Sequence, residues 1–375
     1  MKAAVLVLTD QGLRTAQRII VEWPEGDLPE LWVHRNCQGD SSRELAHEHN
    51  ESGLSLHFFR ELKEVVPELW KECAVLMFIM ATGIVVRHIA PLLQSKDRDP
   101  AILVLDEKGE FVIPLLSGHL GGANAWARKV ANRIGAQPVL TTATDVRGLT
   151  APDEYARQFG WAVEPVAKLR KVNRFLLDKG YLNVWSDYEL PEHHPLRQDS
   201  HYRFLDESDK GKAHLWISVQ KVSRTRDFAD ENCFERFDET PLQMIPRVFS
   251  IGVGCRRGAS TEQILEAIQV GLNQIGISRE SVQGIYSIDL KAKEVGIQEA
   301  AQVLGVPFQT FSAEKVQAVN EDRVLSCSGY VREKIGVDGV CEATSLLGTK
   351  QGELVLPKQK LNGVTVAISQ EKSMS

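Results

Sequence analysis

The chain has 375 residues, of which 43% are hydrophobic and 25% are charged. This length predicts roughly two or three domains, each with its own core, and the composition excludes the disordered and fibrous classes. The formal net charge of −6 at pH 7 argues against general nucleic-acid binding, and an anionic substrate must therefore be held by local arginines and lysines.

The cysteines show neither a C-x-x-C pair nor a spacing typical of zinc sites. They are Cys37, Cys73, Cys233, Cys255, Cys327 and Cys341. Free thiols in a reducing compartment fit this scatter best. The apolar run at the start of the sequence is too short for a signal peptide, and no stretch reaches the length of a membrane span. We therefore expect a cytoplasmic protein that has no membrane partner and no metal site of its own.

The first part of the chain alternates strand and helix signals, which predicts a domain built around a parallel sheet. The expected strands are 3–8, 31–34, 74–80, 101–105, 111–115 and 139–141. The expected helices are 12–20, a segment marked by Phe58, Leu62, Val65, Val66 and Leu69, then 82–93 and 123–134. We expect Ile84, Val85, Ile89, Leu92 and Leu93 to reach the core, and residues 106–109 to form a hairpin turn. His47 and His49 lie in a polar stretch that reads as a solvated loop, since no third metal ligand stands nearby.

A glycine-rich loop joins the strand 111–115 to the helix 123–134. It reads Ser117-Gly118-His119-Leu120-Gly121-Gly122, and Gly135 is expected to end the helix. Backbone N–H groups near the positive end of a helix dipole stabilise a carboxylate, a phosphate or an oxyanion. The spacing is neither a dinucleotide fingerprint nor a P-loop, so a tight turn needed only for packing has equal weight.

Asp145 ends the segment Thr142-Ala143-Thr144-Asp145, which follows the next expected strand. If the sheet is parallel, this segment and the glycine loop lie on one edge, where ligands collect. A helix N-cap role explains Asp145 equally well. Upstream, Arg87 and His88 are neighbours and point about 100° apart on a helix, so they do not share one face. A structural role for His88 is more frequent than catalysis.

The rest of the chain predicts a smaller middle domain and a C-terminal α/β domain. The divisions are 1–148, 149–246 and 247–375. In the middle domain we expect helical structure from Pro152, strands at 181–185 and 214–219, a polar loop over 189–212 with His193 and His194 on the surface, and irregular structure over 228–243.

The C-terminal domain repeats the order of strand, glycine loop and helix. A strand over 248–253 leads to Gly254-Cys255-Arg256-Arg257-Gly258, and Ser260 with Gln263 forms a capping box. Arg256 and Arg257 beside a helix start suit a carboxylate, although surface salt bridges explain them equally well. We expect Cys255 to be a packed residue rather than a nucleophile. Asn362-Gly363 predicts a hairpin.

Six phrases of the sequence resemble a known family. GIVVRHIAPLLQSKDRDPA, LLSGHLGGAN and TTATD are similar to the amino-terminal part of the CbiG family, the cobalt-precorrin-5A hydrolases of cobalamin biosynthesis. IGVGCRRGASTEQI, YSIDLKAKEVGIQEAA and KLNGVTVAI are similar to its carboxy-terminal part, which resembles the separate protein CobE. The resemblance implies hydrolysis of the lactone of cobalt-precorrin-5A, with release of acetaldehyde, to give cobalt-precorrin-5B.

Lactone hydrolysis needs a base for water and donors for an oxyanion. We expect His119 to be the base, with His88 as the alternative and Asp145 orienting the imidazole. The substrate-binding candidates are Arg87, Lys96, Ser117, Gly118, Gly121, Gly122, Asn124, Arg256 and Arg257, with the macrocycle held between the end domains. No cofactor is expected, because cobalt is carried by the substrate, and neighbouring pathway enzymes are candidate partners. A non-catalytic carrier of tetrapyrrole intermediates and a nucleotide-phosphate enzyme are the competing functions.

Overall fold

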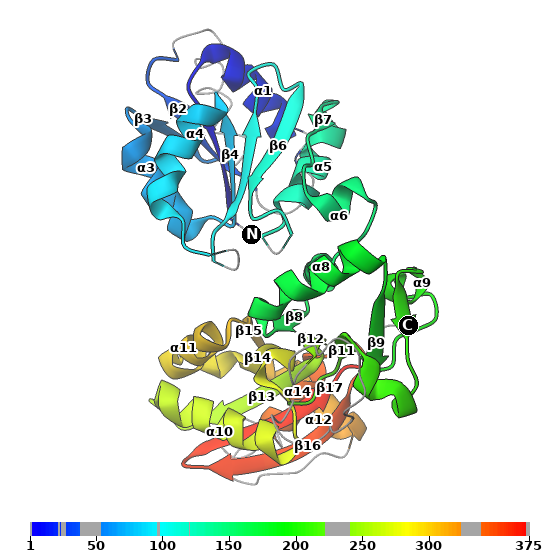
Figure 1. Ribbon diagram of the computed structural model, residues 1–375. Helices are drawn as coiled ribbons and strands as arrows, with labels where there is room; N and C mark the ends of the chain where they lie inside the picture. The colour runs from blue at the N-terminus through cyan, green and yellow to red at the C-terminus, as the bar shows by residue number, and fades with distance from the viewer. Residues whose placement is uncertain are drawn as a thin grey trace. The chain divides into compact units, whose positions relative to one another are not determined.

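The computed structural model describes residues 2–21, 23, 28–37, 54–95, 98–119, 121–221, 241–323 and 339–372. They divide into two compact units, residues 1–157 and 158–375 (Figure 1). The expected α/β architecture is confirmed, since helices cover sheets in which parallel strands dominate. None of the described helices is long and apolar enough to cross a membrane. Lys96, His47 and His49 lie outside the described residues.

The first unit is built on one sheet with the strand order β3-β2-β1-β4-β5-β6-β7. The strands are β1 (Ala3–Val7), β2 (Glu30–His34), β3 (Leu56–Phe59), β4 (Val75–Ile79), β5 (Ala101–Leu105), β6 (Phe111–Leu116) and β7 (Gln137–Pro138). The helices are α1 (Asp10–Val21), α3 (Leu62–Glu72), α4 (Thr82–Ile89), η1 (Ala90–Leu92), α5 (Ala123–Ile134), α6 (Ala143–Val146) and α7 (Pro152–Phe159), the last reaching the start of the second unit.

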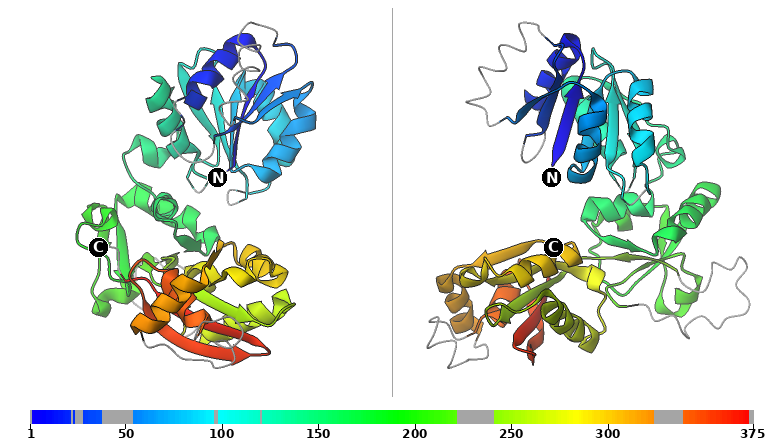
Figure 2. Two further views of the ribbon diagram at one scale, coloured as in Figure 1. Left: turned by 180° about the vertical axis from the view of Figure 1, so that it is seen from behind. Right: turned by 90° about the vertical axis from the view of Figure 1, so that its left-hand side faces the viewer.

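Helices cover both faces of this sheet, as the two views of Figure 2 show. Alternate side chains of a strand point to opposite faces, so Val5 and Val7 join a core with α1 and α5, whereas Leu6 joins a core with α3 and α4. Strands buried on both sides read as continuous apolar runs, which is why Ala3–Val7 and Val75–Ile79 were recognisable in the sequence.

The direction of β6 decides where the glycine loop lies. Strands β1 to β5 are parallel, β6 is antiparallel to β5 through the expected hairpin, and β7 is parallel to β6. The carboxyl ends of β6 and β7 therefore lie at the edge where β1 to β5 begin. The glycine loop and the segment 142–145 share one edge as expected, but it is the opposite edge from the carboxyl ends of β1 to β5.

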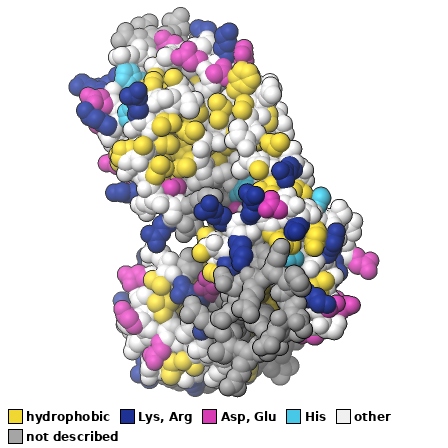
Figure 3. All heavy atoms as spheres, in the orientation of Figure 1, with side chains coloured by type: hydrophobic (Ala, Val, Ile, Leu, Met, Phe, Trp, Pro, Cys, Tyr) yellow, Lys and Arg dark blue, Asp and Glu magenta, His cyan; other side chains and the backbone are white. Residues whose placement is uncertain are grey.

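Several local expectations for this unit were wrong. Phe58 belongs to strand β3 rather than to a helix, and the expected strand 139–141 is replaced by β7 (Gln137–Pro138). In the helix 82–93, Val85 and Ile89 are buried, but Ile84 and Leu93 are 36% and 48% exposed. Apolar periodicity marks a helix face without telling whether anything covers it. Figure 3 shows hydrophobic side chains gathered on the face of the first unit that carries α3 and α4.

The second unit contains two sheets of five strands, ordered β10-β9-β11-β12-β8 and β15-β14-β13-β17-β16. The strands are β8 (Ala162–Glu164), β9 (Leu182–Ser186), β10 (Tyr202–Phe204), β11 (Leu215–Ile217), β12 (Leu242–Ile245), β13 (Phe249–Cys255), β14 (Val282–Ile288), β15 (Phe308–Phe311), β16 (Glu353–Leu361) and β17 (Val364–Gln370). The helices are η2 (Val166–Lys168), α8 (Leu169–Lys179), α9 (Pro195–Gln198), η3 (Glu207–Lys212), α10 (Thr261–Gln274), η4 (Arg279–Ser281), η5 (Asp289–Lys291), α11 (Val295–Leu304), α12 (Ala313–Arg323) and α14 (Cys341–Leu347).

The capping box of Ser260 and Gln263 is confirmed, as is the hairpin at Asn362-Gly363, where both residues have positive φ. Three expectations for this unit were wrong. The segment 228–243, expected to be irregular, ends in strand β12 with Leu242 and Gln243, and its residues 228–240 lie outside the described ones. Residues 189–212 hold α9, β10 and η3 rather than a loop, and His194 is buried at 7% exposure instead of lying on the surface. The stretch is mostly polar, so its sequence predicts a loop. Its short elements are held by a few apolar residues that pack inward.

Helix α14 lies against β13 at backbone distance, which only a glycine on the strand allows. A Cβ added to Gly252 would overlap the carbonyl oxygen of Cys341 and come within 2.7 Å of the amide nitrogen of Ser345. The helix is buried along almost its whole length. Because backbone atoms cannot move aside as a side chain can, α14 would have to shift as a body to admit a methyl group.

We therefore predict that Gly252→Ala lowers the free energy of unfolding by roughly 3 kcal/mol or more. Urea denaturation followed by circular dichroism measures it. Gly211→Ala is the matched control, since a Cβ there meets no atom within 4 Å and its φ is not positive. Equal urea midpoints for the two variants would show that α14 does not pack against β13 at Gly252 as closely as described.

Candidate functional site

The glycine loop turns tightly between β6 and α5, and two of its glycines are required by close contacts. A Cβ on Gly121 would overlap the side chain of Ser117 and lie 2.9 Å from its carbonyl oxygen. A Cβ on Gly118 would lie 2.8 Å from Oδ1 of Asn124. Ser117 itself has a φ of 58°, and its hydroxyl donates to the carbonyl of Asp99 at 2.9 Å. These contacts fix the path of the loop around His119.

The amides at the start of α5 are satisfied by the loop itself. The N–H of Gly122 donates to the carbonyl of His119, that of Ala123 to Ser117 and that of Asn124 to Gly118, at 2.9 to 3.1 Å. An open cradle for a phosphate would need these N–H groups to be free. In the described part of the chain, the amides of Gly118, His119 and Gly121 have no assigned acceptor. They remain the candidate oxyanion donors.

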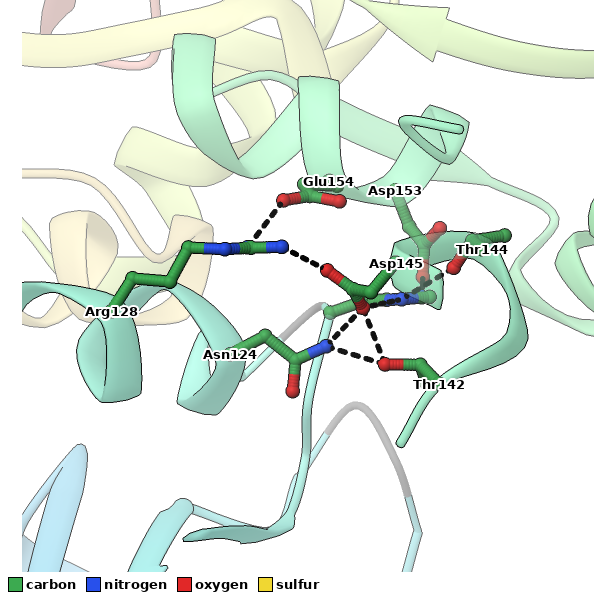
Figure 4. Close-up of polar contacts among 8 residues, drawn as sticks. Asn124, Arg128, Thr142, Thr144, Asp145, Asp153 and Glu154 are labelled. Carbon is green, nitrogen blue, oxygen red and sulfur yellow. Dashed lines mark hydrogen bonds and ion pairs between the residues drawn. The ribbon is translucent and has the colours of Figure 1, made fainter. Parts of the chain in front are cut away.

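Asp145 is the anchored carboxylate of the site and lies at the centre of the contacts drawn in Figure 4. Its side chain is only 2% exposed. Its Oδ2 accepts from Nδ2 of Asn124 at 2.7 Å and from the hydroxyl of Thr142, and its Oδ1 is paired with the guanidinium of Arg128. A buried carboxylate is tolerated only with such partners. The side chain of Asp145 therefore ties α6 to two successive turns of α5.

The imidazole of His119 lies between two carboxylates. Its Nδ1 is 3.4 Å from Oδ2 of Asp153, which belongs to α7. Its Nε2 is 3.1 Å from the hydroxyl of Thr144 and 3.6 Å from Oδ2 of Asp145. The His119 side chain is 14% exposed, so it is mostly shielded from solvent. With Asp153 accepting from Nδ1, the neutral ring leaves Nε2 for proton transfer.

Charges around the ring set its protonation. Burial lowers the pKa of His119, but the hydrogen bond to Asp153 and the negative charges of Asp153, Glu154 and Asp145 raise it above its usual value overall. Burial raises the pKa of Asp145, but its bonds to Thr142 and Arg128 bring it below the usual value. The pKa of Glu154 is raised by burial and by Asp145. The pKa of Asp145 is thus held below its usual value and that of His119 above its usual value, as expected for a carboxylate and an imidazole that face each other.

Of the other candidates from the sequence, Asn124 joins this network but Arg87 and His88 do not. Nδ1–H of His88 donates to the carbonyl of Ile84, one turn earlier in α4, at 2.8 Å. No hydrogen bond or ion pair in the described chain links Arg87 or His88 to His119, and Arg87 is exposed. The substrate-binding role of Arg87 and the alternative role of His88 as base therefore stay predictions, which this geometry does not support directly.

The second glycine loop, between β13 and α10, already holds a carboxylate of the protein. Oε2 of Glu294 accepts from the N–H of Gly258 at 3.1 Å, and Lys291 pairs with Oε1 at 3.0 Å. Arg256 and Arg257 are exposed beside it. Burial raises the pKa of Cys255, which agrees with a packed thiol rather than an activated nucleophile.

Sequence reasoning missed Arg128, Asp153, Glu154 and Thr144 as members of the network. Arg128 lies four residues after Asn124, hence on the same face of α5, and this spacing was a usable signal. Asp153 and Glu154 looked like ordinary acidic residues in the first turn of a helix. In the described residues, no group of three or more histidine, cysteine or acidic side chains could hold a metal ion.

Comparisons with known proteins agree with the resemblance seen in the sequence. Three family models match successive parts of the chain: cobalamin synthesis G N-terminal over residues 64–145, cobalamin biosynthesis central region over 150–246, and cobalamin synthesis G C-terminus over 249–369. The C-terminal part also matches the protein CobE of a Sinorhizobium species, at 30% identity over 30% of this chain and 71% of CobE.

Two relatives are named cobalt-precorrin-5A hydrolase. The protein from Priestia megaterium is 29% identical over 98% of this chain and 94% of its own length. The protein from Salmonella typhimurium is 33% identical over 78% of this chain and 81% of its own length. With all three family regions present in order, the chain belongs to the CbiG family, the cobalt-precorrin-5A hydrolases.

Proposed function

We propose that the protein hydrolyses the lactone of cobalt-precorrin-5A and releases acetaldehyde, giving cobalt-precorrin-5B in cobalamin synthesis. Relatives with this function in their names align over most of the chain. The structural observation that supports it is the imidazole of His119 between Asp153 and Thr144, because lactone hydrolysis needs a positioned group that moves protons near neutral pH.

In the first step water adds to the lactone carbonyl. Nε2 of His119 takes the proton from water, while Asp153 holds Nδ1–H and so fixes the tautomer and the ring orientation. The tetrahedral oxyanion is stabilised by backbone amides of the loop, with those of Gly118, His119 and Gly121 as candidates. Collapse of this intermediate breaks the ester C–O bond and yields a carboxylate and an alcohol.

In the second step the alcohol loses its proton and the adjacent carbon–carbon bond breaks. Acetaldehyde leaves, and the electron pair passes to the conjugated macrocycle, which is then protonated. The ring acts as the electron sink, so this step asks only for proton transfer from the protein. We propose that no dissociable cofactor is needed, because the cobalt comes with the substrate.

The substrate's carboxylate arms need cations, since the net charge of the chain is −6. We propose that the exposed Arg87, Arg256 and Arg257 bind these arms, together with Lys96. Guanidinium groups suit carboxylates because they form two parallel hydrogen bonds. That the ring lies between the end domains stays a prediction, as do action in the cytoplasm and contacts with neighbouring enzymes of the pathway.

Substitution of His119 tests the base directly. We expect His119→Asn to lower acetaldehyde release from the cobalt lactone by about 10²- to 10⁴-fold, because the proton acceptor is lost while the size of the side chain is kept. His88→Asn is the control, and should keep near-normal turnover. Full activity in the His119 variant would end the assignment, and loss only in the His88 variant would move the role to that residue.

The raised pKa of His119 gives a signed prediction for the pH dependence. A base works when deprotonated, so kcat/KM should rise with pH through an apparent pKa above the ordinary histidine value of about 6.5. Asp153→Asn removes a hydrogen bond and a charge that raise this pKa, so the rising limb should move to lower pH while the maximal rate falls.

Glu68→Gln, an exposed carboxylate on α3, serves as the control and should leave the limb in place. The readout is a full pH profile of acetaldehyde release for the three proteins. If Asp153→Asn folds normally and the rising part of its pH profile stays at the same pH, that part of the profile does not reflect the titration of His119.

Carboxylate binding is tested by equilibrium titration with the substrate. Alanine at Arg87, Arg256 or Arg257 should raise the substrate Kd by roughly 3- to 10-fold per lost charge-assisted contact. Arg133→Ala, on the exposed side of α5, is the matched control. Unchanged Kd values in all three variants would remove these residues from the substrate site.

The same experiments separate the competing functions. Stoichiometric binding of the cobalt lactone without acetaldehyde would indicate a carrier. A nucleotide-phosphate enzyme is disfavoured by the loop geometry, because the amides of Gly122, Ala123 and Asn124 are already paired with loop carbonyls.

A further inference from the structure

A cavity of about 270 Å³ lies within the second unit, where the segments that connect its two sheets meet. Its lining residues come from the ends of α7, β9 and β12, from β14, and from the segments after α14 and β17. None of them belongs to the His119 network. The cavity is thus a separate site, and hydrolysis as described above makes no use of it.

Aromatic side chains from the middle part of the chain form one wall. The rings of Trp161 and His194 are parallel within 15° with centroids 5.7 Å apart, and Phe159 lies against both, at 5.2 and 4.4 Å. Tyr188 meets Trp161 edge to face at 6.3 Å. Four rings held together in this way offer a rigid apolar surface, which favours a flat ligand by stacking and area burial.

His194 adds a hydrogen-bond donor to this wall. Its Nδ1 accepts from the N–H of Leu196 at the start of α9, at 3.3 Å. In a neutral imidazole the proton then resides on Nε2, which becomes a donor. Burial, with the nearby His193 and Arg197, lowers the pKa of His194, so the ring is neutral at pH 7 and its stacking surface carries no charge.

Cationic side chains from the C-terminal part form the other wall, with Arg247, Lys350 and Lys372 against the single carboxylate of Glu371. In the described chain, neither Arg247 nor Lys350 forms an ion pair, and Nη1 of Arg247 makes one long hydrogen bond, to the carbonyl of Gly305 at 3.4 Å. Lys372 is 4.0 Å from Glu353, a long and exposed contact. The charged wall therefore has an excess of positive charge that an anionic ligand would neutralise.

We propose that this cavity binds a small aromatic carboxylate of one or two fused rings, with the ring on the Trp161 wall and the carboxylate on Arg247 and Lys350. The volume of about 270 Å³ lies just below the range of about 300 to 1,000 Å³ for pockets that hold drug-sized ligands, which suits a smaller ligand of one or two rings. A tetrapyrrole with its arms is much larger than this cavity. The site gives the middle part of the chain a binding role independent of the hydrolase proposal.

Calorimetric titration of the full chain with indole-3-carboxylate tests the proposal. We expect saturable binding with a Kd on the order of 0.1 to 1 mM, as for a fragment of this size. Indole-3-carboxamide, which lacks the charge, and cyclohexanecarboxylate, which lacks the aromatic ring, should each bind at least about 5-fold more weakly. The two analogues separate the roles of the two walls.

Variants then place the binding in this cavity. Arg247→Gln and Lys350→Gln should each weaken indole-3-carboxylate by roughly 5- to 10-fold, with unchanged melting temperature. Lys360→Gln, an exposed lysine of β16 that does not line the cavity, should bind like the parent protein. Absence of saturation in the parent protein, equal affinity for the carboxamide, or equal weakening by Lys360→Gln would overturn the proposal. None of these outcomes depends on acetaldehyde release.

Discussion

The burial of Asp145 beside His119 is the constraint on which the first unit's site depends. A carboxylate at 2% exposure must be paired, and the hydroxyl of Thr142, the amide of Asn124 and the guanidinium of Arg128 do this together. Removing Arg128 would take away the cation among these three partners, and removing either of the others would cost the carboxylate a hydrogen bond. The pairing therefore fixes the position of α6 on α5, and with it the side of the imidazole that faces Thr144.

The antiparallel course of β6 is the second requirement. If a right-handed crossover had joined β5 to β6, β6 would be parallel to β1 to β5. Its carboxyl end, and the glycine loop after it, would then lie at the opposite edge of the sheet. The hairpin at 106–109 instead brings β6 back, so the glycine loop, the 142–145 segment and the start of α7 come together. The site combines a base, two carboxylates and free amides because three chain segments end at one edge.

The charged groups of the second unit are arranged differently from those around His119 in the first. At its glycine loop, Glu294 occupies the amide of Gly258, so a carboxylate of the protein takes the place that an anionic ligand would use. Around the aromatic wall of Trp161, by contrast, cations outnumber carboxylates. The site proposed for proton transfer therefore lies in the first unit, and the site proposed for a flat anion lies in the second.

The sequence by itself determined the α/β class, most buried strands of the first unit, the glycine turn, the capping box of Ser260 and the family. Local sequence patterns predict these features, namely continuous apolar runs, turn residues that favour positive φ, and motif spacing. His119 and Asp145 were chosen as candidates because each stands in a short segment after an expected strand, and the structure places Nε2 of His119 3.6 Å from Oδ2 of Asp145.

Only the tertiary structure decided which side chains meet. Asp153 reaches His119 from a helix 34 positions later in the chain, and its own pattern marks only a helix start. His194, expected on the surface, is buried by aromatic partners from other segments. Burial and pairing depend on contacts between residues distant in sequence, and a local pattern carries no information about such contacts. The direction of β6 decides at which edge of the sheet the site lies, and the apolar periodicity of the sequence does not predict that edge.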